Sequence, residues 1–125
     1  MTRQSIRIEL IEDDRLLARQ FIGQLSHEIG WVVHHSTDAV EAIRSIDEVL
    51  PDIIILDVLL PAATAFTLLH ELQSYEDTRI IPVIICSSIA ENLSLNELSP
   101  YGVVAVLDKA TLTPEELRRA VQVAL

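Results

Sequence analysis

The chain has few of the residues that mark several classes of protein. Its single cysteine, Cys86, excludes an internal disulfide. No apolar run is long enough to cross a bilayer, and residues 1–5 lead into a strand pattern rather than a long apolar signal segment. We therefore expect a cytoplasmic protein that makes no use of a membrane.

Positive charge is scarce as well. Nine lysines and arginines against 19 aspartates and glutamates give a formal net charge of -10. This surplus repels phosphate backbones and anionic lipid headgroups, so we expect no direct binding of nucleic acid.

The histidines have no recognisable zinc-ligand spacing with the lone cysteine and are expected at the surface or at a sheet edge; they are His27, His34, His35 and His70.

Aromatic residues make up only 4% of the chain, whereas half of its 125 residues are hydrophobic. The core must therefore consist of Ile, Leu, Val and Ala, which is typical of a parallel sheet covered by helices. The length fits one compact domain, and neither an internal repeat nor a linker is visible. We expect residues 1–125 to form a single domain.

Strand-type and helix-type periods alternate along the sequence. Strands are expected at Ile6–Ile11, Trp31–His35, Ile53–Leu56, Ile80–Cys86 and Val103–Leu107. Helices are expected from about Arg15 to Glu28, around Ala39, Ile43, Ile46 and Leu50, around Phe66, Leu69 and Leu72, more weakly around Leu93, Leu95 and Leu98, and after Thr113. Five alternating β-α units predict an α/β fold, a doubly wound parallel sheet with right-handed crossovers.

Sequence signals also indicate where helices begin and end. Asp38 and Glu41 are spaced as an N-cap and its reciprocal partner, and Thr113–Glu116 supplies a cap, a proline and a glutamate. The apolar stripe of the first helix extends to Ile29, and Gly30 is expected to end it.

Polar residues follow four of the predicted strands. Glu12 and Asp13 follow the first strand and Asp57 the third, while Ser87 and Lys109 follow the fourth and fifth. A carboxylate is costly to bury, so we interpret Asp57 as a functional residue in a crevice at the carboxyl ends of the strands. Together these groups suit a divalent cation beside a phosphoryl group.

Each of these residues also has a simpler interpretation. The run Glu12–Asp14 is typical of a helix N-terminus, where negative charge favours the helix dipole. Alone, Lys109 is a solvated loop lysine and Ser87 a strand-end hydroxyl. Their shared location with Asp57 favours the functional interpretation.

The chain resembles, over nearly its whole length, the receiver domain of two-component response regulators. The matching segments are Leu10–Asp14, Ile54–Pro61, Ile81–Ser87 and Leu107–Lys109. The resemblance implies a flavodoxin-like, CheY-like fold with five helices and the strand order 2-1-3-4-5.

It also implies a function for the carboxylates. Asp57 would attack the phosphorus of a phosphohistidine on a histidine kinase or phosphotransfer protein and form an aspartyl phosphate. Glu12, Asp13, Asp57 and the backbone carbonyl of Leu59 would hold Mg²⁺, which prefers oxygen ligands. No independent enzymatic turnover is expected.

Two further residues would complete the switch. Lys109 would pair with the phosphoryl oxygens, and the Ser87 hydroxyl would donate to one of them. The inward movement of Ser87 and its loop would bias the face built from the fourth helix, fifth strand and fifth helix. An output domain or target protein would bind this face, and the resemblance also allows a homodimer.

The sequence departs from the family at two of these output positions. Ala110 follows Lys109 where the family usually has a proline, often in a cis peptide, and a cis bond before alanine is costly. Val106 stands where many receivers have a tyrosine or phenylalanine that swings inward. We therefore expect a different loop after the fifth strand and a different output mechanism.

Three other functions fit parts of the sequence. Val106 and Ala110 favour a phosphorylation-independent interaction module of the same fold, a pseudo-receiver. The presence of all three acidic residues and of the lysine expected for phosphorylation argues against this function. An aspartate-nucleophile phosphatase usually has a second aspartate as general acid where this chain has Leu59. A flavodoxin-like FMN carrier needs a phosphate loop rich in Ser, Thr and Gly where this chain has carboxylates.

Overall fold

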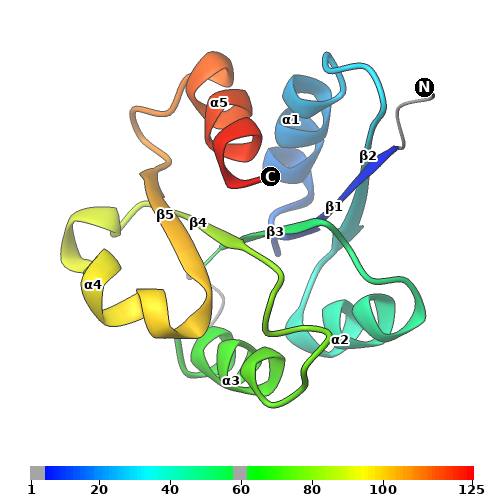
Figure 1. Ribbon diagram of the computed structural model, residues 1–125. Coiled ribbons are helices and arrows are strands. Elements are labelled where there is room, and N and C mark those ends of the chain that lie inside the picture. Colours follow the sequence, from blue (N-terminus) through cyan, green and yellow to red (C-terminus); the bar gives the residue numbers. More distant parts are fainter. Residues whose placement is uncertain (1–4, 58–61) are drawn as a thin grey trace.

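The computed structural model describes residues 5–57 and 62–125 (Figure 1). The strands are β1 (Ile6–Ile11), β2 (Trp31–Ser36), β3 (Ile53–Leu56), β4 (Val83–Ser87) and β5 (Val103–Asp108). The helices are α1 (Arg15–Leu25), α2 (Ala39–Glu48), α3 (Ala62–Gln73), α4 (Leu95–Leu98) and α5 (Pro114–Ala124). Two 3₁₀ turns, η1 (Ala90–Asn92) and η2 (Ser99–Tyr101), flank α4.

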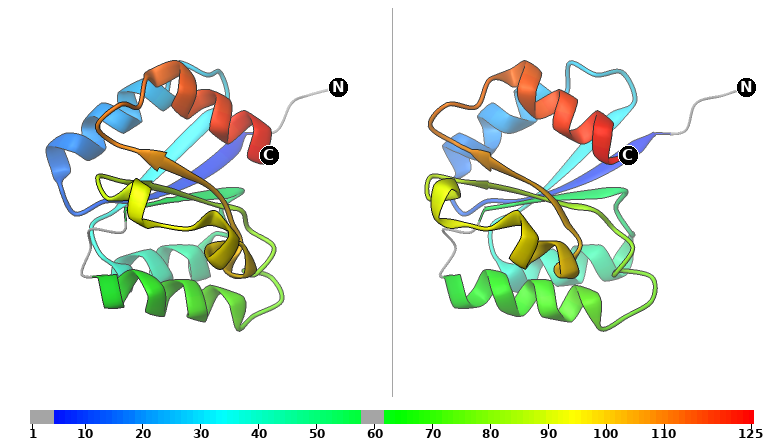
Figure 2. Two further views of the ribbon diagram at one scale, coloured as in Figure 1. Left: turned by 90° about the vertical axis from the view of Figure 1, so that its left-hand side faces the viewer. Right: turned by 60° about the vertical axis from the view of Figure 1, so that its left-hand side comes forward.

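All the strands are parallel and form one sheet in the order β2-β1-β3-β4-β5. Helices α1 and α5 cover one face, whereas α2, α3 and the short α4 cover the other (Figure 2). The predicted doubly wound fold and its strand order are therefore confirmed.

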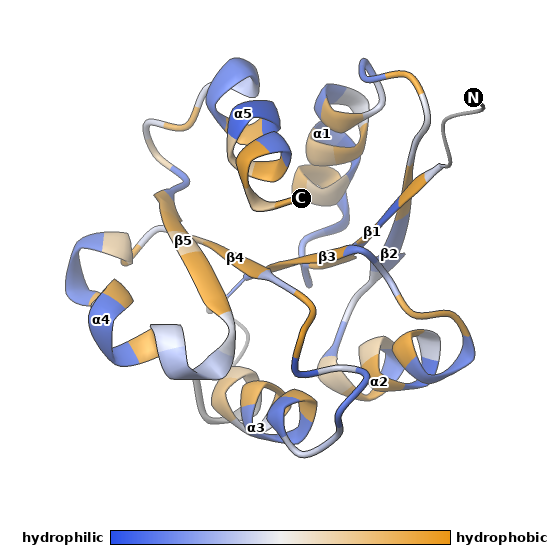
Figure 3. Cartoon of the chain, in the orientation of Figure 1, coloured by the Kyte–Doolittle hydropathy of each residue, from blue (hydrophilic) through white to orange (hydrophobic). Residues whose placement is uncertain are grey.

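Each face of the sheet has its own aliphatic core, and hydrophobic residues follow the strands through the centre of the molecule (Figure 3). Beneath α1 and α5 lie alternate strand residues such as Ile8, Leu10 and Ile55, and Ile11 and Ile54 lie beneath α2 and α3. Strand β3 is buried on both faces, as its uninterrupted apolar sequence predicts.

Apolar residues outside the core explain three errors in the predicted boundaries. Helix α1 ends at Leu25 rather than near Glu28, and Ile29 is 90% exposed because the chain has already turned toward Gly30. Gly30 has a φ of 86°, a conformation that glycine adopts without strain. Helix α2 likewise ends before Leu50, which is exposed.

The third error concerns β4, which begins at Val83 and not at Ile80. The preceding segment is a turn in which the Ile81 N–H donates to the Thr78 carbonyl at 3.1 Å, and Ile80 is 77% exposed. Pro82 has no N–H to add to the ladder and lies just before the strand.

The predicted helix caps are present, with one difference. Thr113 Oγ1 accepts from the Glu116 N–H at 3.2 Å, and Asp38 Oδ1 accepts from the Glu41 N–H at 2.8 Å. The Glu41 carboxylate, however, accepts from the N–H and hydroxyl of Thr37 rather than from Asp38. The reciprocal half of this capping box is thus displaced by one residue.

The weaker helix predicted around Leu93–Leu98 is a single α-helical turn between two 3₁₀ turns. Leu98 is its buried residue, whereas Leu95 is 42% exposed. No helix within residues 5–57 and 62–125 has the length and apolar content that a membrane span requires.

Candidate functional site

The predicted site residues lie where β1, β3, β4 and β5 end. Backbone hydrogen bonds extend the sheet by one residue at this edge: the Asp57 N–H donates to the Ile11 carbonyl at 3.0 Å, and the Lys109 N–H donates to the Ser87 carbonyl at 3.2 Å. The sheet therefore fixes the backbone from which these side chains project.

Three carboxylates meet at this edge. Oxygen atoms of Glu12, Asp13 and Asp57 lie within 4.8 Å of one another. Glu12 and Asp57 are buried, and Asp13 is exposed at the mouth. A hard cation that prefers oxygen ligands and retains some water fits such a half-open group of donors.

Lys109 lies between two of these carboxylates. Its Nζ is 2.6 Å from Glu12 Oε1 and 3.0 Å from Asp57 Oδ2, and only 13% of its side chain is exposed. Burial lowers the pKa of this ammonium, but the hydrogen bonds to Glu12 and Asp57 outweigh burial and leave its pKa above the ordinary value. Lys109 is therefore a fixed positive charge inside the acidic pocket.

Burial changes the pKa of the Glu12 carboxyl. Burial, followed by its hydrogen bond with Asp57, raises the pKa of Glu12 to about 7, although Lys109 and the Asp14 N–H act in the opposite direction. Near neutral pH Glu12 is consequently partly protonated, and a bound cation would displace that proton.

Ser87 is fully buried at the end of β4. Its Oγ accepts from the Ile89 N–H at 3.1 Å, which links the hydroxyl to the start of the following loop. Leu59, whose carbonyl was predicted as a metal ligand, lies outside the described residues, so that role stays a prediction.

The loop after β5 has a turn that sequence reasoning missed. Asp108 Oδ1 accepts from the Ala110 N–H at 2.9 Å, and the Asp108 carbonyl accepts from the Thr111 N–H at 3.3 Å. A proline at position 110 would have no N–H for the first of these bonds. The described residues contain no cis peptide, so this loop holds Lys109 through an aspartate-centred turn.

A contact of His35 with Glu12 was also missed, whereas the role of Asp14 was predicted. His35 Nε2 lies 2.7 Å from the Glu12 backbone carbonyl. Asp14 caps α1, because its Oδ1 accepts from the N–H groups of Leu16 and Leu17 at 3.0 and 3.1 Å. The interpretation of Glu12–Asp14 as a helix N-terminus is thus correct for Asp14, whereas Glu12 and Asp13 point into the pocket with Asp57.

The family model described as the response regulator receiver domain matches residues 8–122. The chain is 31% identical over 113 residues to a protein-glutamate methylesterase/protein-glutamine glutaminase of Oleidesulfovibrio alaskensis, covering 86% of this chain and 30% of that protein. It is 33% identical over 112 residues to a gliding motility regulatory protein of Myxococcus xanthus, covering 90% and 14% respectively. The chain thus spans less than a third of these relatives.

Solved structures show the same fold. Chemotaxis protein CheY4 of Vibrio cholerae superimposes with a TM-score of 0.83 at 21% identity, over 97% of this chain and 99% of that one. The receiver domain of a sensor histidine kinase from Pseudomonas aeruginosa, solved with a magnesium ion coordinated in its active-site cleft, has a TM-score of 0.81 at 25% identity, over 96% and 97%. The chain belongs to the response regulator receiver domain family.

Proposed function

We propose that Asp57 accepts a phosphoryl group from a phosphohistidine of a histidine kinase or phosphotransfer protein. The observation that carries this proposal is the position of Asp57, a buried carboxylate at a strand end, 3.0 Å from the Lys109 ammonium and grouped with Glu12 and Asp13. Receiver domains interact with histidine kinases and output domains, and residues 1–125 would form one such domain.

In the proposed transfer, an Asp57 oxygen forms a bond to phosphorus while the phosphorus–nitrogen bond of the donor breaks, and the electron pair stays on the imidazole nitrogen. Mg²⁺ held by Glu12, Asp13 and Asp57 would neutralise charge between the carboxylate and the phosphoryl oxygens. We propose that the Leu59 carbonyl is a further ligand.

The ionic partner of Lys109 would change during the transfer. Before transfer Lys109 pairs with both Glu12 and Asp57. After transfer its ammonium would pair with the phosphoryl group, because phosphorylation moves negative charge outward from Asp57. The Ser87 hydroxyl would donate to the same group and draw its loop inward. The face of α4, β5 and α5 would then change its affinity for an output domain or target.

The direct test is incubation with a small phosphodonor and Mg²⁺, followed by intact mass and peptide mapping. We expect one added phosphoryl group on Asp57 and none in Asp57→Asn. Asp52→Asn is a matched control, because Asp52 is an exposed aspartate at the opposite end of β3. An unchanged wild-type mass, under conditions that label another receiver, would instead support the phosphorylation-independent interaction module.

A further inference from the structure

A cavity of about 260 Å³ lies between the C-terminal halves of α2 and α3. Its floor is apolar: Ile46 and Leu72 are buried and Ile43 is partly buried. Thr78 adds no free polar group to the floor, because its hydroxyl already donates to the Leu72 carbonyl. The floor therefore suits an aliphatic chain.

The rim of this cavity is acidic. Asp47 from α2, Glu71 from α3 and Asp77 from the following segment are exposed there. None of them makes an ion pair with another residue in the described part of the chain, although Arg44 and Arg79 are nearby in sequence.

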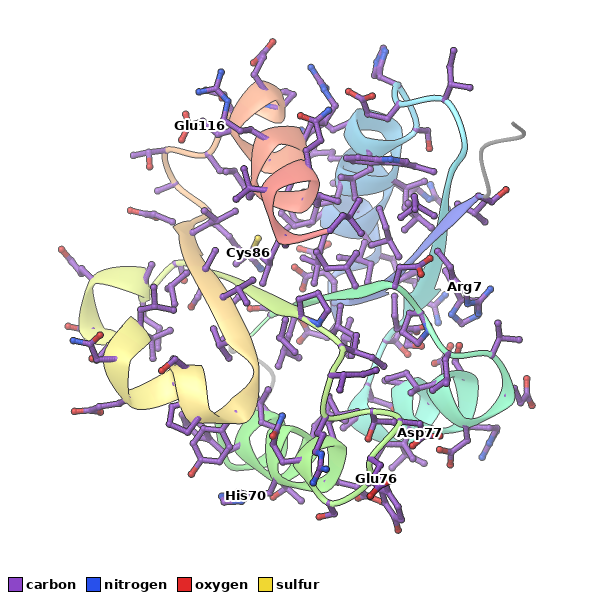
Figure 4. All side chains as sticks on the ribbon, in the orientation of Figure 1. Arg7, His70, Glu76, Asp77, Cys86 and Glu116 are labelled. Atoms are coloured by element: carbon purple, nitrogen blue, oxygen red, sulfur yellow. The ribbon has the colours of Figure 1, made fainter. Side chains whose placement is uncertain are left out.

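Both helices also end at this place. The last turn of α2 contains no basic residue, and the last turn of α3 contains only His70, whose ring packs against Tyr101. The negative ends of the two helix dipoles therefore add to the carboxylates. In Figure 4, Asp77 lies between α2 and the end of α3, with Glu76 next to it. The region thus combines exposed carboxylates and two helix C-termini above an apolar floor.

Tyr75 completes the lining and identifies the kind of cation. Tyr75 is 59% exposed and lines the cavity. A guanidinium stacks on aromatic rings, pairs with carboxylates in a planar fork and has an aliphatic stem that packs on apolar surface. A bare metal ion fits less well, because the only group of three or more close His, Cys, Asp or Glu ligands among the described residues is the one at Asp57.

We propose that the α2–α3 cavity docks an arginine side chain of a partner protein. The stem would lie on Ile46 and Leu72, and the guanidinium would lie between Tyr75 and the carboxylates of Glu71 and Asp77. Because α3 begins after Asp57 and its C-terminal end lies at the opposite edge of the sheet (Figure 2), docking would not require phosphorylation.

The proposal is tested by nuclear magnetic resonance titration of the ¹⁵N-labelled chain with acetyl-Leu-Arg-Leu-amide at about 150 mM salt, where nonspecific attraction is screened. We expect shifts concentrated at Leu72, Tyr75 and Thr78. The same peptide with citrulline in place of arginine keeps the shape and loses the charge, and it should bind at least about fivefold more weakly.

Variants locate the binding. Glu71→Gln with Asp77→Asn should weaken binding of the arginine peptide about fivefold, whereas the control Glu91→Gln with Glu97→Gln removes the same charge elsewhere and should leave affinity within about twofold. Equal binding of the citrulline peptide, or unchanged affinity of the rim variant, would overturn the proposal. Asp57→Asn should bind normally, so this test and the phosphorylation test fail independently.

Discussion

Lys109 pairs with two buried carboxylates at the end of the sheet, and burial outweighs this pairing in setting the pKa of Glu12. Its ammonium is 2.6 Å from Glu12 and 3.0 Å from Asp57. One positive charge does not fully compensate the buried Glu12, whose pKa rises to about 7. The pocket is therefore arranged to exchange a proton for a cation near neutral pH.

This arrangement gives a pH prediction. The folded chain holds the Glu12 proton more tightly than the unfolded chain, so the associated stability is fully present below about pH 4.5 and is lost as pH rises through about 7. Glu12→Gln stays neutral and should become more stable relative to wild type between pH 5 and 8 without Mg²⁺. Urea unfolding at several pH values measures the difference, and a difference that does not change with pH would contradict the assignment.

A second prediction concerns the exposed ligand. Mg²⁺ should raise the melting temperature of the wild type, because the ion binds only the folded site and relieves repulsion between carboxylates. Asp13→Asn should remove most of this rise, and Asp38→Asn, an exposed aspartate at the α2 cap, should retain it. Equal rises in all three proteins would show that the ion is not held by Asp13.

Among the elements, β1, β2 and α2 are joined by a buried polar contact. The search for strand-end residues in the sequence does not predict this contact. Glu9 is fully buried on the α2 face of β1. It accepts from Ser36 and from Ser45, the latter at 2.9 Å, and lies 3.0 Å from His34 Nδ1. An edge strand, a central strand and a helix thus share one carboxylate.

Removing that carboxylate should be costly. Glu9→Ala leaves the Ser36 and Ser45 hydroxyls buried without their acceptor, so we expect a loss of about 3 kcal/mol in the free energy of unfolding. Glu48→Ala is the control: the residue is exposed, and its loss should change stability by less than about 0.5 kcal/mol. Urea denaturation of both variants checks the prediction, and equal midpoints would show that Glu9 contributes little.

The same elements show what sequence patterns can predict. The bounds of β3 follow from an apolar run with polar residues at both ends, and those of β1 from a mainly apolar segment that also contains Arg7 and Glu9. The site residues follow because parallel strands end at one edge. Ile29 and Ile80 are apolar yet exposed, and hydrophobic periodicity has no means of separating them from core residues. The Glu9 contact depends on the packing of three elements against one another. The spacing of residues along the sequence does not predict that packing.

At the scale of the whole molecule, acidic groups gather at opposite ends of the sheet. One group surrounds Asp57, and the other surrounds the α2–α3 cavity. Both contribute to the formal net charge of -10. Their separation would allow the proposed phosphorylation at one end of the sheet and the proposed docking of a partner at the other.

In the proposed switch, the response to phosphorylation would extend toward α4 and β5. Val106 is partly buried against the core beneath α2 and α3 and has neither an aromatic ring nor a hydroxyl with which to exchange partners. Ser87, by contrast, is bonded directly to Ile89 in the loop that leads to η1 and α4. We expect hydrogen-exchange changes on phosphorylation to concentrate from Ser87 to Leu98, with smaller changes at Val106.

Val106→Ala tests this route. The lost packing should lower the free energy of unfolding by about 1 kcal/mol. Asp57 phosphorylation and the response of residues 88–98 should remain, because the signal passes through the Ser87 loop and does not need the Val106 side chain. If the folded, fully phosphorylated variant showed no response in that segment, Val106 would be an obligatory relay. The coupling would then run through β5.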